Sequence, residues 1–254
     1  DRTIAKVRLA SDEATAVALR SLTDSSEVEY AEPNYRYTTL DAGVPNDPQF
    51  SKLWHLSNQG QPDSTGAAGK PGMDINVMPV WAEGSTGSKS VVVAVIDTGI
   101  EWDHPDLAPN LYTNPGEAGD KASNGIDDDG NGFIDDVHGW NFAAKTRASS
   151  DDQGHGTHCA GSIGAKGNDG AGVVGVNWDV TLMPVKFLDA QGGGTLQGAL
   201  EAINYATQMK VQVMSNSWGG GGFSQALLDT IQKASDAGIL FVAAAGNDGS
   251  NNDT

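Results

Sequence analysis

Three chemically capable side chains each follow an apolar or small-residue stretch of the sequence. Asp97 ends an apolar run over residues 91–96, His155 lies among small residues, and Asn247 follows alanines and a glycine. A buried carboxylate that holds one imidazole nitrogen leaves the other nitrogen as a general base, and an amide N–H can donate to a developing oxyanion. The three residue types therefore predict a hydrolase site. Two alternatives stay open: Asp97 as the cap of a turn, and Asn247 as a left-handed turn residue.

Two neighbours of His155 allow other chemistry. His158 follows three residues later, so a metal-dependent hydrolase built on Asp97, His155 and His158 is an alternative. The zinc motif on a helix instead spaces its histidines four apart around a glutamate. Cys159 is the single cysteine, which excludes an intrachain disulfide, and we interpret it as a small hydrophobic residue rather than as a nucleophile.

A run of alternating oxygen-bearing residues stands apart from the hydrolase residues. Its candidate ligands are Asp127, Asp129, Asn131, Phe133, Asp135 and Asp136, and Gly132 permits a sharp turn. Ligands at every second residue match the first half of the EF-hand loop, whose seventh position contributes a backbone carbonyl. His138 stands where that loop requires a bidentate Glu, so we expect Asp135 and Asp136 to complete a Ca²⁺ site. A solvated acidic loop is the alternative.

The elements that must position these residues alternate along the chain. Apolar runs predict strands over residues 91–96, 181–188, 211–215 and 239–245, and helical spacing predicts helices over 155–163, 195–209 and 224–237. This alternation predicts an α/β fold with a doubly wound, mostly parallel sheet and helices on both faces. Ligands then gather at the carboxyl ends of the strands, where Asp97 and Asn247 are expected.

Two segments that follow predicted strands are rich in glycine. They contain Gly192, Gly193 and Gly194 in one case, and Ser217, Trp218, Gly219 and Gly220 in the other. Uncovered backbone of this kind can pair with an extended peptide by β-augmentation. Flexible linkers are the alternative interpretation.

Residues 1–40 read differently from the rest of the chain. They predict a strand over 4–9, a helix over 11–21 and a second strand over 28–33, a partial α+β piece that buries little area by itself. Residues 41–70, rich in Gly, Pro, Asp and Ser, predict a linker, and residues 78–81 a short helix. Because the sequence ends just after its last predicted strand, we expect the domain to continue beyond Thr254.

Composition narrows the range of partners. The formal net charge of -18 disfavours binding to nucleic-acid phosphates. No apolar run approaches the ~20 residues of a membrane-spanning helix. A loop-rich globular chain that binds cations through some of its acidic residues is the resulting expectation.

Taken together, these motifs resemble those of the subtilisin-like serine proteases, the subtilases. Three ordered stretches carry the resemblance: residues 95–100 with the following 104–107, residues 154–161, and residues 244–247. Residues 217–220 are similar to the family's substrate-binding segment, and Cys159 is similar to the cysteine of the proteinase K branch. The resemblance covers roughly residues 41–254.

The resemblance implies a serine endopeptidase in which Asp97 orients the imidazole, His155 is the general base and Asn247 contributes to the oxyanion hole. Two strands, 192–194 and 217–220, would flank the substrate, with Ala244, Ala245 and Gly246 near the first specificity pocket. The family's Gly-Thr-Ser-Met-Ala stretch does not occur here. We therefore expect the serine beyond Thr254 and no peptide hydrolysis by residues 1–254 alone. A non-catalytic, calcium-stabilised peptide-binding or inhibitory fragment is the alternative.

The resemblance also implies how the chain is divided and what it meets. Residues 1–40 would be part of an inhibitory propeptide, cleaved near Leu40, and residues 41–254 an incomplete catalytic domain. A second Ca²⁺ is expected near Asp47 and Asp106. The expected partners are a polypeptide substrate and the propeptide, without nucleic acid or membrane, and the expected form is a secreted or extracellular monomer.

Overall fold

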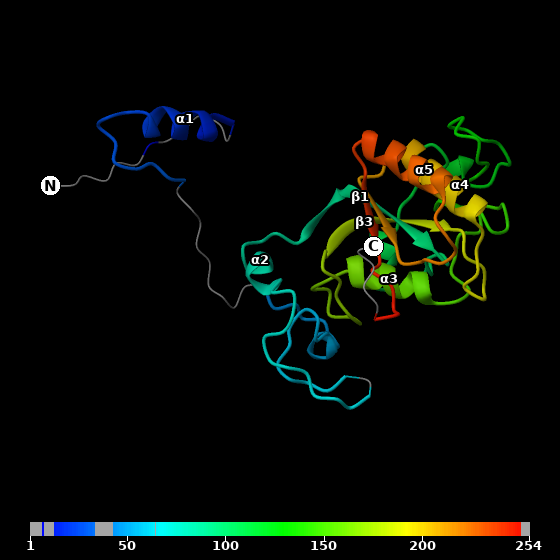
Figure 1. Cartoon of the computed structure of the whole chain (residues 1–254), viewed down its shortest axis with the longest axis horizontal. Helices are drawn as coiled ribbons and strands as arrows, with labels where there is room; N and C mark the ends of the chain where they lie inside the picture. The colour runs from blue at the N-terminus through cyan, green and yellow to red at the C-terminus, as the bar shows by residue number, and fades with distance from the viewer. Residues whose placement is uncertain (1–6, 8–12, 34–42, 64, 250–254) are drawn as a thin grey trace. The chain divides into compact units, whose positions relative to one another are not determined.

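The computed structural model describes residues 7, 13–33, 43–63 and 65–249. Contacts divide the chain into two compact units, Asp1–Thr39 and Leu40–Thr254. Several of their elements are labelled in Figure 1. The larger unit contains every residue of the predicted hydrolase and cation sites.

The first unit contains one described helix, α1 (Glu13–Thr23), which confirms the helix predicted over residues 11–21. Arg20 lies in its last turn, where a cation is favoured by the helix dipole. The prediction of a strand over 28–33 is wrong, because these residues are irregular. A strand needs a hydrogen-bonded neighbour, and the described residues of this unit form no ladder. Of the strand predicted over 4–9, only Val7 lies among the described residues.

A five-stranded sheet forms the centre of the second unit. Its strands are β1 (Gly87–Asp97), β2 (Trp140–Asn141), β3 (Asp179–Lys186), β4 (Val213–Asn216) and β5 (Leu240–Ala243). Their order is β2-β3-β1-β4-β5, and every neighbouring pair is parallel. Four of them confirm the strands predicted from apolar runs, with shifted ends. The sequence does not predict β2, because two residues are too few to show a periodicity.

Helices cover both faces of this sheet, which confirms the predicted α/β doubly wound fold. The helix α3 (His155–Gly164) lies on one face, and α4 (Leu196–Gln208) and α5 (Gln225–Asp236) lie side by side on the other (Figure 1). Within the described ranges, none of the helices combines the length and the apolar character needed to cross a membrane.

The strand β1 sits between two hydrophobic clusters, because successive side chains of a strand point to opposite faces. Val93 and Val95 join the cluster on the α3 side, whereas Ala94 and Ile96 join the cluster under α4 and α5. All four are buried. Burial on both faces explains why this strand reads as an unbroken apolar run.

Side-chain caps set the beginnings of two helices. Thr195 Oγ1 accepts a hydrogen bond from the Gly198 N–H at 3.0 Å at the start of α4, and the predicted cap Ser224 accepts one from the Leu227 N–H at 3.2 Å at the start of α5. Such caps satisfy amide groups that have no partner inside the helix. The short helices are α2 (Met78–Ala82), as predicted, and the 3₁₀ turns Phe50–Lys52, Ala108–Asn110 and Gly119–Lys121.

Part of the predicted linker packs against the rest of the second unit. Leu56 is fully buried and joins a small apolar cluster with Val77, Trp81 and Val174. Trp81 Nε1 donates to the Val176 carbonyl at 3.0 Å. The segment before the first core strand is therefore anchored to the loop that follows α3.

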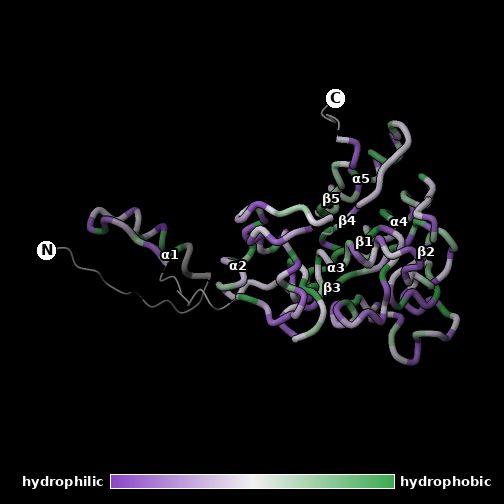
Figure 2. The backbone as a smooth tube through the Cα atoms, turned by 90° about the horizontal axis from the view of Figure 1, so that it is seen from below, coloured by the Kyte–Doolittle hydropathy of each residue, from purple (hydrophilic) through white to green (hydrophobic). Residues whose placement is uncertain are grey.

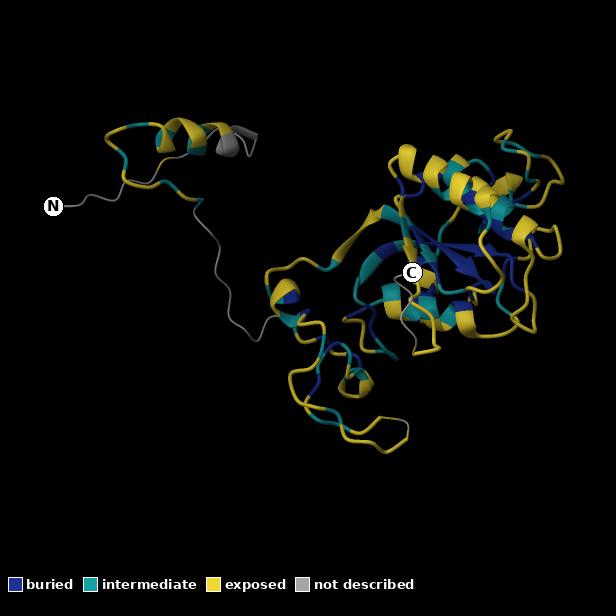
Figure 3. Ribbon diagram, viewed as in Figure 1, coloured by how far each residue is buried: buried dark blue, intermediate teal, exposed yellow. Residues whose placement is uncertain are grey.

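The strand β5 differs from the other long strands in its exposure. Its residues are hydrophobic (Figure 2), yet Leu240 is 61% exposed and Val242 is 46% exposed, whereas most of β3 and the second half of β1 are buried (Figure 3). Leu240 pairs in register with Val213, which belongs to the cluster on the α3 side. The exposed apolar side chains of β5 therefore lie on the face of the sheet that carries α3.

Candidate active site

The end of β1 and the start of α3 bring Asp97 and His155 together, as predicted from the sequence. His155 Nδ1 lies 2.8 Å from Asp97 Oδ1, and the same oxygen accepts the Thr98 N–H at 2.7 Å. Asp97 is 1% exposed, whereas the His155 side chain is 48% exposed. An ionised carboxylate on Nδ1 holds the proton on that nitrogen and leaves Nε2 as the basic atom.

Asp151 fixes the start of α3 through hydrogen bonds of its own carboxylate. Its Oδ1 accepts the N–H groups of Gln153 and Gly154, both at 2.9 Å, and its Oδ2 accepts the N–H and hydroxyl of Thr157. Burial alone would raise the pKa of Asp151, but these hydrogen bonds lower it to about 2. Asp151 is therefore a charged cap that fixes the first turn of α3, in which His155 lies.

Close backbone contact joins α3 to the turn after Asp97. The Gly156 N–H donates to Thr98 Oγ1 at 2.8 Å. A Cβ at Gly156 would lie 2.1 Å from the Gly99 carbonyl oxygen, so only glycine fits at this position. The approach of the helix to the strand end thus explains the glycine that follows His155.

Cys159, which we interpret from the sequence as a small hydrophobic residue, lies close to Asp97 and His155, the pair that we call the dyad. Its Sγ is 3.9 Å from His155 Nδ1, the nitrogen already held by Asp97, and the residue is half-buried. Burial raises the pKa of the thiol, the hydrogen bond with Ser217 lowers it, and the charge of Asp97 raises it further. Because the thiolate is the reactive form, this environment disfavours Cys159 as nucleophile or metal ligand.

The metal alternative with His158 finds no support in the geometry. Asp97, His155 and Cys159 offer ligand atoms within 4.8 Å of one another, and His158 is not in this group. His158 instead lies close enough to His55 to help lower the pKa of that residue, after the larger effect of burial. The two histidines of α3 therefore have different neighbours: His155 contacts Asp97, and His158 lies near His55.

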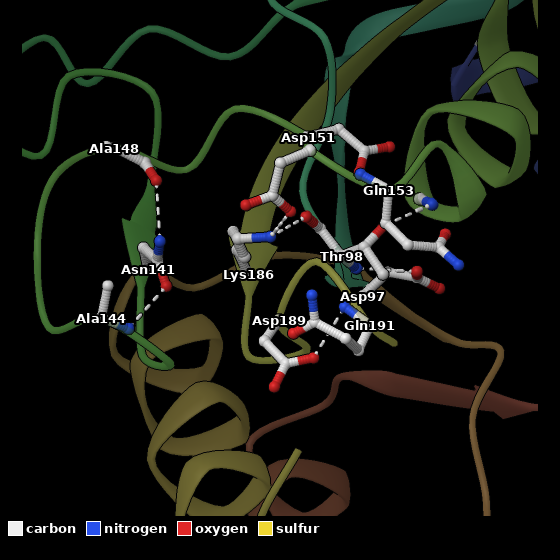
Figure 4. A network of polar contacts seen from close by, with 12 residues as sticks. Asp97, Thr98, Asn141, Ala144, Ala148, Asp151, Gln153, Lys186, Asp189 and Gln191 are labelled. Carbon is white, nitrogen blue, oxygen red and sulfur yellow. Dashed lines mark hydrogen bonds and ion pairs between the residues drawn. The ribbon is translucent and has the colours of Figure 1, made fainter. Parts of the chain in front are cut away.

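The predicted substrate segments follow β3, β4 and β5 at the same edge of the sheet. In residues 192–194, the Gly193 N–H donates to Asp189 Oδ1 at 2.9 Å and its carbonyl accepts the Asp189 N–H at 2.8 Å. Figure 4 shows Asp189 beside Gln191 in this turn. Trp218 packs edge-on against Phe187 with ring centroids 5.0 Å apart.

The segment after β5 contains the remaining predicted residues. The Ala244 N–H donates to the Asn216 carbonyl at 3.0 Å, which extends the pairing of β4 with β5 by one residue. Ala244, Gly246 with its φ of 89°, and Asn247 are exposed. Their roles in binding and in the oxyanion hole stay predictions.

A second group of ionisable side chains lies outside this site. Glu117, Asp129 and Asp136 place carboxylate oxygens within 4.8 Å of one another, and we call them the acidic cluster. Glu117 is fully buried; its Oε1 accepts the Asp128 N–H at 2.6 Å, whereas its Oε2 has no hydrogen-bond partner. A buried carboxylate oxygen without a donor is costly, and an all-oxygen donor set suits a hard cation such as Ca²⁺.

Neutral donors hold the rest of the acidic cluster in place. Asp136 accepts hydrogen bonds from the Tyr205 hydroxyl at 2.6 Å, from Asn114 Nδ2 at 2.7 Å and from Asn131 Nδ2 at 2.9 Å. Burial raises the pKa of Asp136, although these three donors lower it. The desolvation effect prevails, so a cation beside Asp136 would stabilise its charged form.

The other predicted calcium ligands are turned to other partners. Asp127 accepts the N–H groups of Asn131 and Gly132, and Asp135 pairs with Arg147 at 3.3 Å. Asn131 Oδ1 accepts the Phe133 N–H at 2.7 Å. Of the predicted set, the structure gathers Asp129 and Asp136 and adds Glu117, which no spacing rule could indicate because it precedes the motif by ten residues.

The second predicted cation position also contains buried carboxylate oxygens that have no hydrogen-bond partner. Asp47 and Asp106 are both buried, and each has one carboxylate oxygen, Oδ1, without a partner. Their other oxygens accept the Asn168 N–H at 2.7 Å and the Val173 N–H at 2.8 Å, respectively. Burial raises the pKa of Asp47, and the charges of Asp169 and Asp106 add to that rise. Two carboxylates thus hold the two ends of one loop.

Comparisons with known proteins identify the family to which the chain is similar. The model of the subtilase family matches residues 88–254, well over half of the chain. Subtilisin-like protease 1 of Plasmodium berghei is 41% identical over 61% of this chain and 26% of its own length. PC3-like endoprotease variant B of Hydra vulgaris is 32% identical over 93% of this chain and 31% of its own length.

Two further relatives complete the comparison. The major intracellular serine protease of Bacillus subtilis is 36% identical over 70% of this chain and 52% of its own length. A solved cold-adapted subtilisin-like serine proteinase is 27% identical, covers 63% of this chain and 47% of its own, and superposes with a TM-score of 0.44. The chain spans from about a quarter to about half of the curated relatives named here. Because the family model matches residues 88–254, the chain belongs to the subtilase family.

Proposed function

We propose that the chain supplies the orienting acid and the general base of a serine endopeptidase. The observation that carries this proposal is the 2.8 Å contact between Asp97 and His155 Nδ1, made by a fully buried acid and a half-exposed imidazole. In acyl transfer, His155 Nε2 takes the proton of the serine hydroxyl as its oxygen attacks the peptide carbonyl, and then gives that proton to the leaving amine. Water releases the acyl group by the same route in reverse.

The serine itself comes from outside residues 1–254 in this proposal. Within the described residues, no serine or threonine hydroxyl bonds the His155 ring. The exposed apolar face of β5, with Leu240 and Val242 on the α3 side, is suited to pack an additional helix beside α3. Such a helix would bring a serine at its first turn to His155.

We place the substrate-binding segments and the oxyanion hole at the carboxyl ends of the strands, at the same edge of the sheet as Asp97. Asn247 donates to the developing oxyanion, and the segments 192–194 and 217–220 pair with the extended substrate. Because the N–H groups of Gly192 and Gly193 and the Gly193 carbonyl all bond Asp189 within the turn, the Gly192 carbonyl and the backbone of Gly194 carry the pairing on that side. Residues 244–246 lie near the first specificity pocket.

Fluorophosphonate labelling of the full-length protein tests this function. We expect rapid labelling of a serine beyond Thr254, abolished in His155→Ala and retained in the control Cys159→Ala. Residues 1–254 alone should neither label nor hydrolyse a peptide ester. Turnover by the short chain that disappears in Cys159→Ala would contradict the serine mechanism, and peptide binding without any labelling of the full-length protein would favour a non-catalytic binding protein.

We further propose that Ca²⁺ is bound by the acidic cluster, with a second ion at Asp47 and Asp106. The orphaned Oε2 of Glu117 and the orphaned Oδ1 atoms of the second pair support the two positions. Calcium supplies charge neutralisation at these loops and takes no part in the reaction.

A pair of isosteric variants separates the acidic cluster from the EF-like loop beside it. Glu117→Gln should lose much of the calcium-dependent rise in melting temperature, whereas Asp127→Asn should retain it. The reverse result would place the ion in the loop 127–136 instead. Inductively coupled plasma analysis of both variants gives the calcium content directly.

The first unit is proposed to be part of an inhibitory propeptide that is cleaved near Leu40, in a secreted monomeric enzyme. N-terminal sequencing of the mature protein checks the boundary, and a start well beyond Asn46 would show that it is misplaced. Size-exclusion chromatography of the culture medium checks both the location and the monomeric state.

A further inference from the structure

Lys186, the last residue of β3, is a buried lysine next to the dyad. It pairs in register with Asp97 across the parallel strands and is 2% exposed. Lysine is rarely buried unless its ammonium is paired and hydrogen-bonded, because desolvation of the charge is costly. Its place at the carboxyl end of β3 therefore calls for an explanation.

The ammonium of Lys186 bonds both segments that carry the dyad. Nζ donates to the Thr98 carbonyl at 2.5 Å and to Asp152 Oδ1 at 2.7 Å. Figure 4 shows Lys186 directed at Thr98, beside Asp97. Thr98 follows Asp97, and Asp152 precedes His155 by three residues, so one side chain from a third element spans the two segments. We call this contact the Lys186 bridge.

The backbone of the same strand end strengthens this connection. The N–H groups of Phe187 and Leu188 both donate to the Asp97 carbonyl, at 3.0 and 3.3 Å. The turn after β1 is thus held by β3 through its backbone, and the loop before α3 is held through the Lys186 side chain. Without the bridge, β3 would lose its ion pair with the loop before α3.

Lys186 is the register partner of Asp97, but its ammonium forms its ion pair with a different carboxylate. Asp97 Oδ1 is engaged by His155 and by the Thr98 N–H, whereas the buried Oδ2 has no hydrogen-bond partner. Asp152, whose side chain is 55% exposed, is the carboxylate that pairs with the buried ammonium. This division leaves the Asp97 carboxylate for the imidazole.

We propose that Lys186 is a positioning residue for the Asp97–His155 pair, with Asp152 as its counter-ion. This role rests on the proposed peptidase function. Catalytic groups must hold their geometry closely, and a displacement of about 1 Å can cost about 100-fold in rate. The bridge contacts neither of the segments proposed to bind substrate, so its loss should lower kcat and leave KM nearly unchanged.

The test uses the full-length protein and four variants. Lys186→Met removes the ammonium, Lys186→Arg keeps a cation, and Asp152→Asn removes the counter-charge at an exposed position. The control is Lys166→Met, which breaks the pair of Lys166 with Asp179 at 2.7 Å at the opposite end of β3. Peptide turnover, the rate of fluorophosphonate labelling and the melting temperature are measured for each.

We expect kcat and the labelling rate to fall together, by about 100-fold in Lys186→Met and about 10-fold in Asp152→Asn. KM should stay within about threefold, Lys186→Arg should recover part of the rate, and Lys166→Met should react like the wild type. A labelling rate probes the base and its alignment in folded molecules, which a purely structural role would leave intact.

Several results would overturn the positioning role. They are wild-type labelling by Lys186→Met, an equal loss in the Lys166→Met control, or a loss that only follows the folded fraction. If Lys186→Met does not fold, Asp152→Asn decides, and wild-type rates in that variant count against the bridge. A wild-type protein that turns over no peptide and labels at no serine would instead refute the peptidase function, and the role of Lys186 with it.

Discussion

The dyad and the acidic cluster are both built on buried carboxylates. The carboxylate of the dyad has basic side chains as neighbours, whereas the buried carboxylate of the acidic cluster has other carboxylates. Asp97, 1% exposed, faces the imidazole of His155, with the ammonium of Lys186 one strand away. Glu117, fully buried, faces the carboxylates of Asp129 and Asp136. One oxygen of each acid, Asp97 Oδ2 and Glu117 Oε2, has no hydrogen-bond partner, but the first acid faces a basic side chain and the second faces further carboxylates.

The pKa shifts follow the same division. Hydrogen bonds at the dyad end lower the pKa of Asp151 to about 2, against the effect of burial. In the acidic cluster, burial raises the pKa of Asp136 in spite of three donors. The comparison teaches that the chain itself supplies a basic partner for the buried acid of the dyad, whereas the acidic cluster is the place where we propose that a bound cation supplies the positive charge.

The largest effect should come from breaking the dyad. Asp97→Asn removes the charge that holds the Nδ1 tautomer of His155, and we expect kcat of the full-length enzyme to fall by about 10⁴-fold. The measurement is steady-state hydrolysis of a peptide ester. The calcium-dependent rise in melting temperature should be unaffected, and a change in that rise would show that the two regions are coupled.

Removal of calcium should act on the opposite region. At a hundredfold excess over Kd, an ion that binds only the folded state adds about 2.7 kcal/mol of stability, or about 5–10 °C in melting temperature for a domain of this size. Chelation should therefore lower the melting temperature by that amount. Equal melting temperatures with calcium and with chelator would contradict the idea that the acidic cluster needs a cation.

A smaller effect is expected from the hydroxyl that supports the acidic cluster. Tyr205→Phe deletes the 2.6 Å hydrogen bond to the buried carboxylate of Asp136, which should cost about 2 kcal/mol of unfolding free energy. Denaturant titration measures it. The loss should be larger in chelator than in calcium, because a bound ion shares the stabilisation of the Asp136 charge, and an equal loss would place the ion elsewhere.

The smallest effect concerns pH. The pKa of Asp151 is lowered in the folded state, so its contribution to stability is complete above its ordinary value of 3.8 and is lost as the pH falls toward about 2. Asp151→Asn should therefore be less stable than the wild type at neutral pH, with the difference shrinking between pH 4 and pH 2. A difference that stays constant over this range, by denaturant unfolding, would show that the carboxylate charge does not matter.

Much of the fold follows from short-range patterns. The apolar run before Asp97 predicts β1 because a strand covered on both faces needs no polar side chains. The helix after His155 is predicted by its small residues, and the start of α5 by Ser224. The strand predicted over residues 28–33 is wrong because local alternation does not specify a partner strand.

By itself, the sequence determined the order of the main strands and helices, and it placed Asp97 and His155 at neighbouring ends of β1 and α3. Only the tertiary structure decided that Glu117 joins Asp129 and Asp136, and that Lys186 spans the two segments of the dyad. The physical reason is distance along the chain. Periodicity, caps and turns are set by residues within a few positions of one another, whereas these groupings meet only when separate loops pack together.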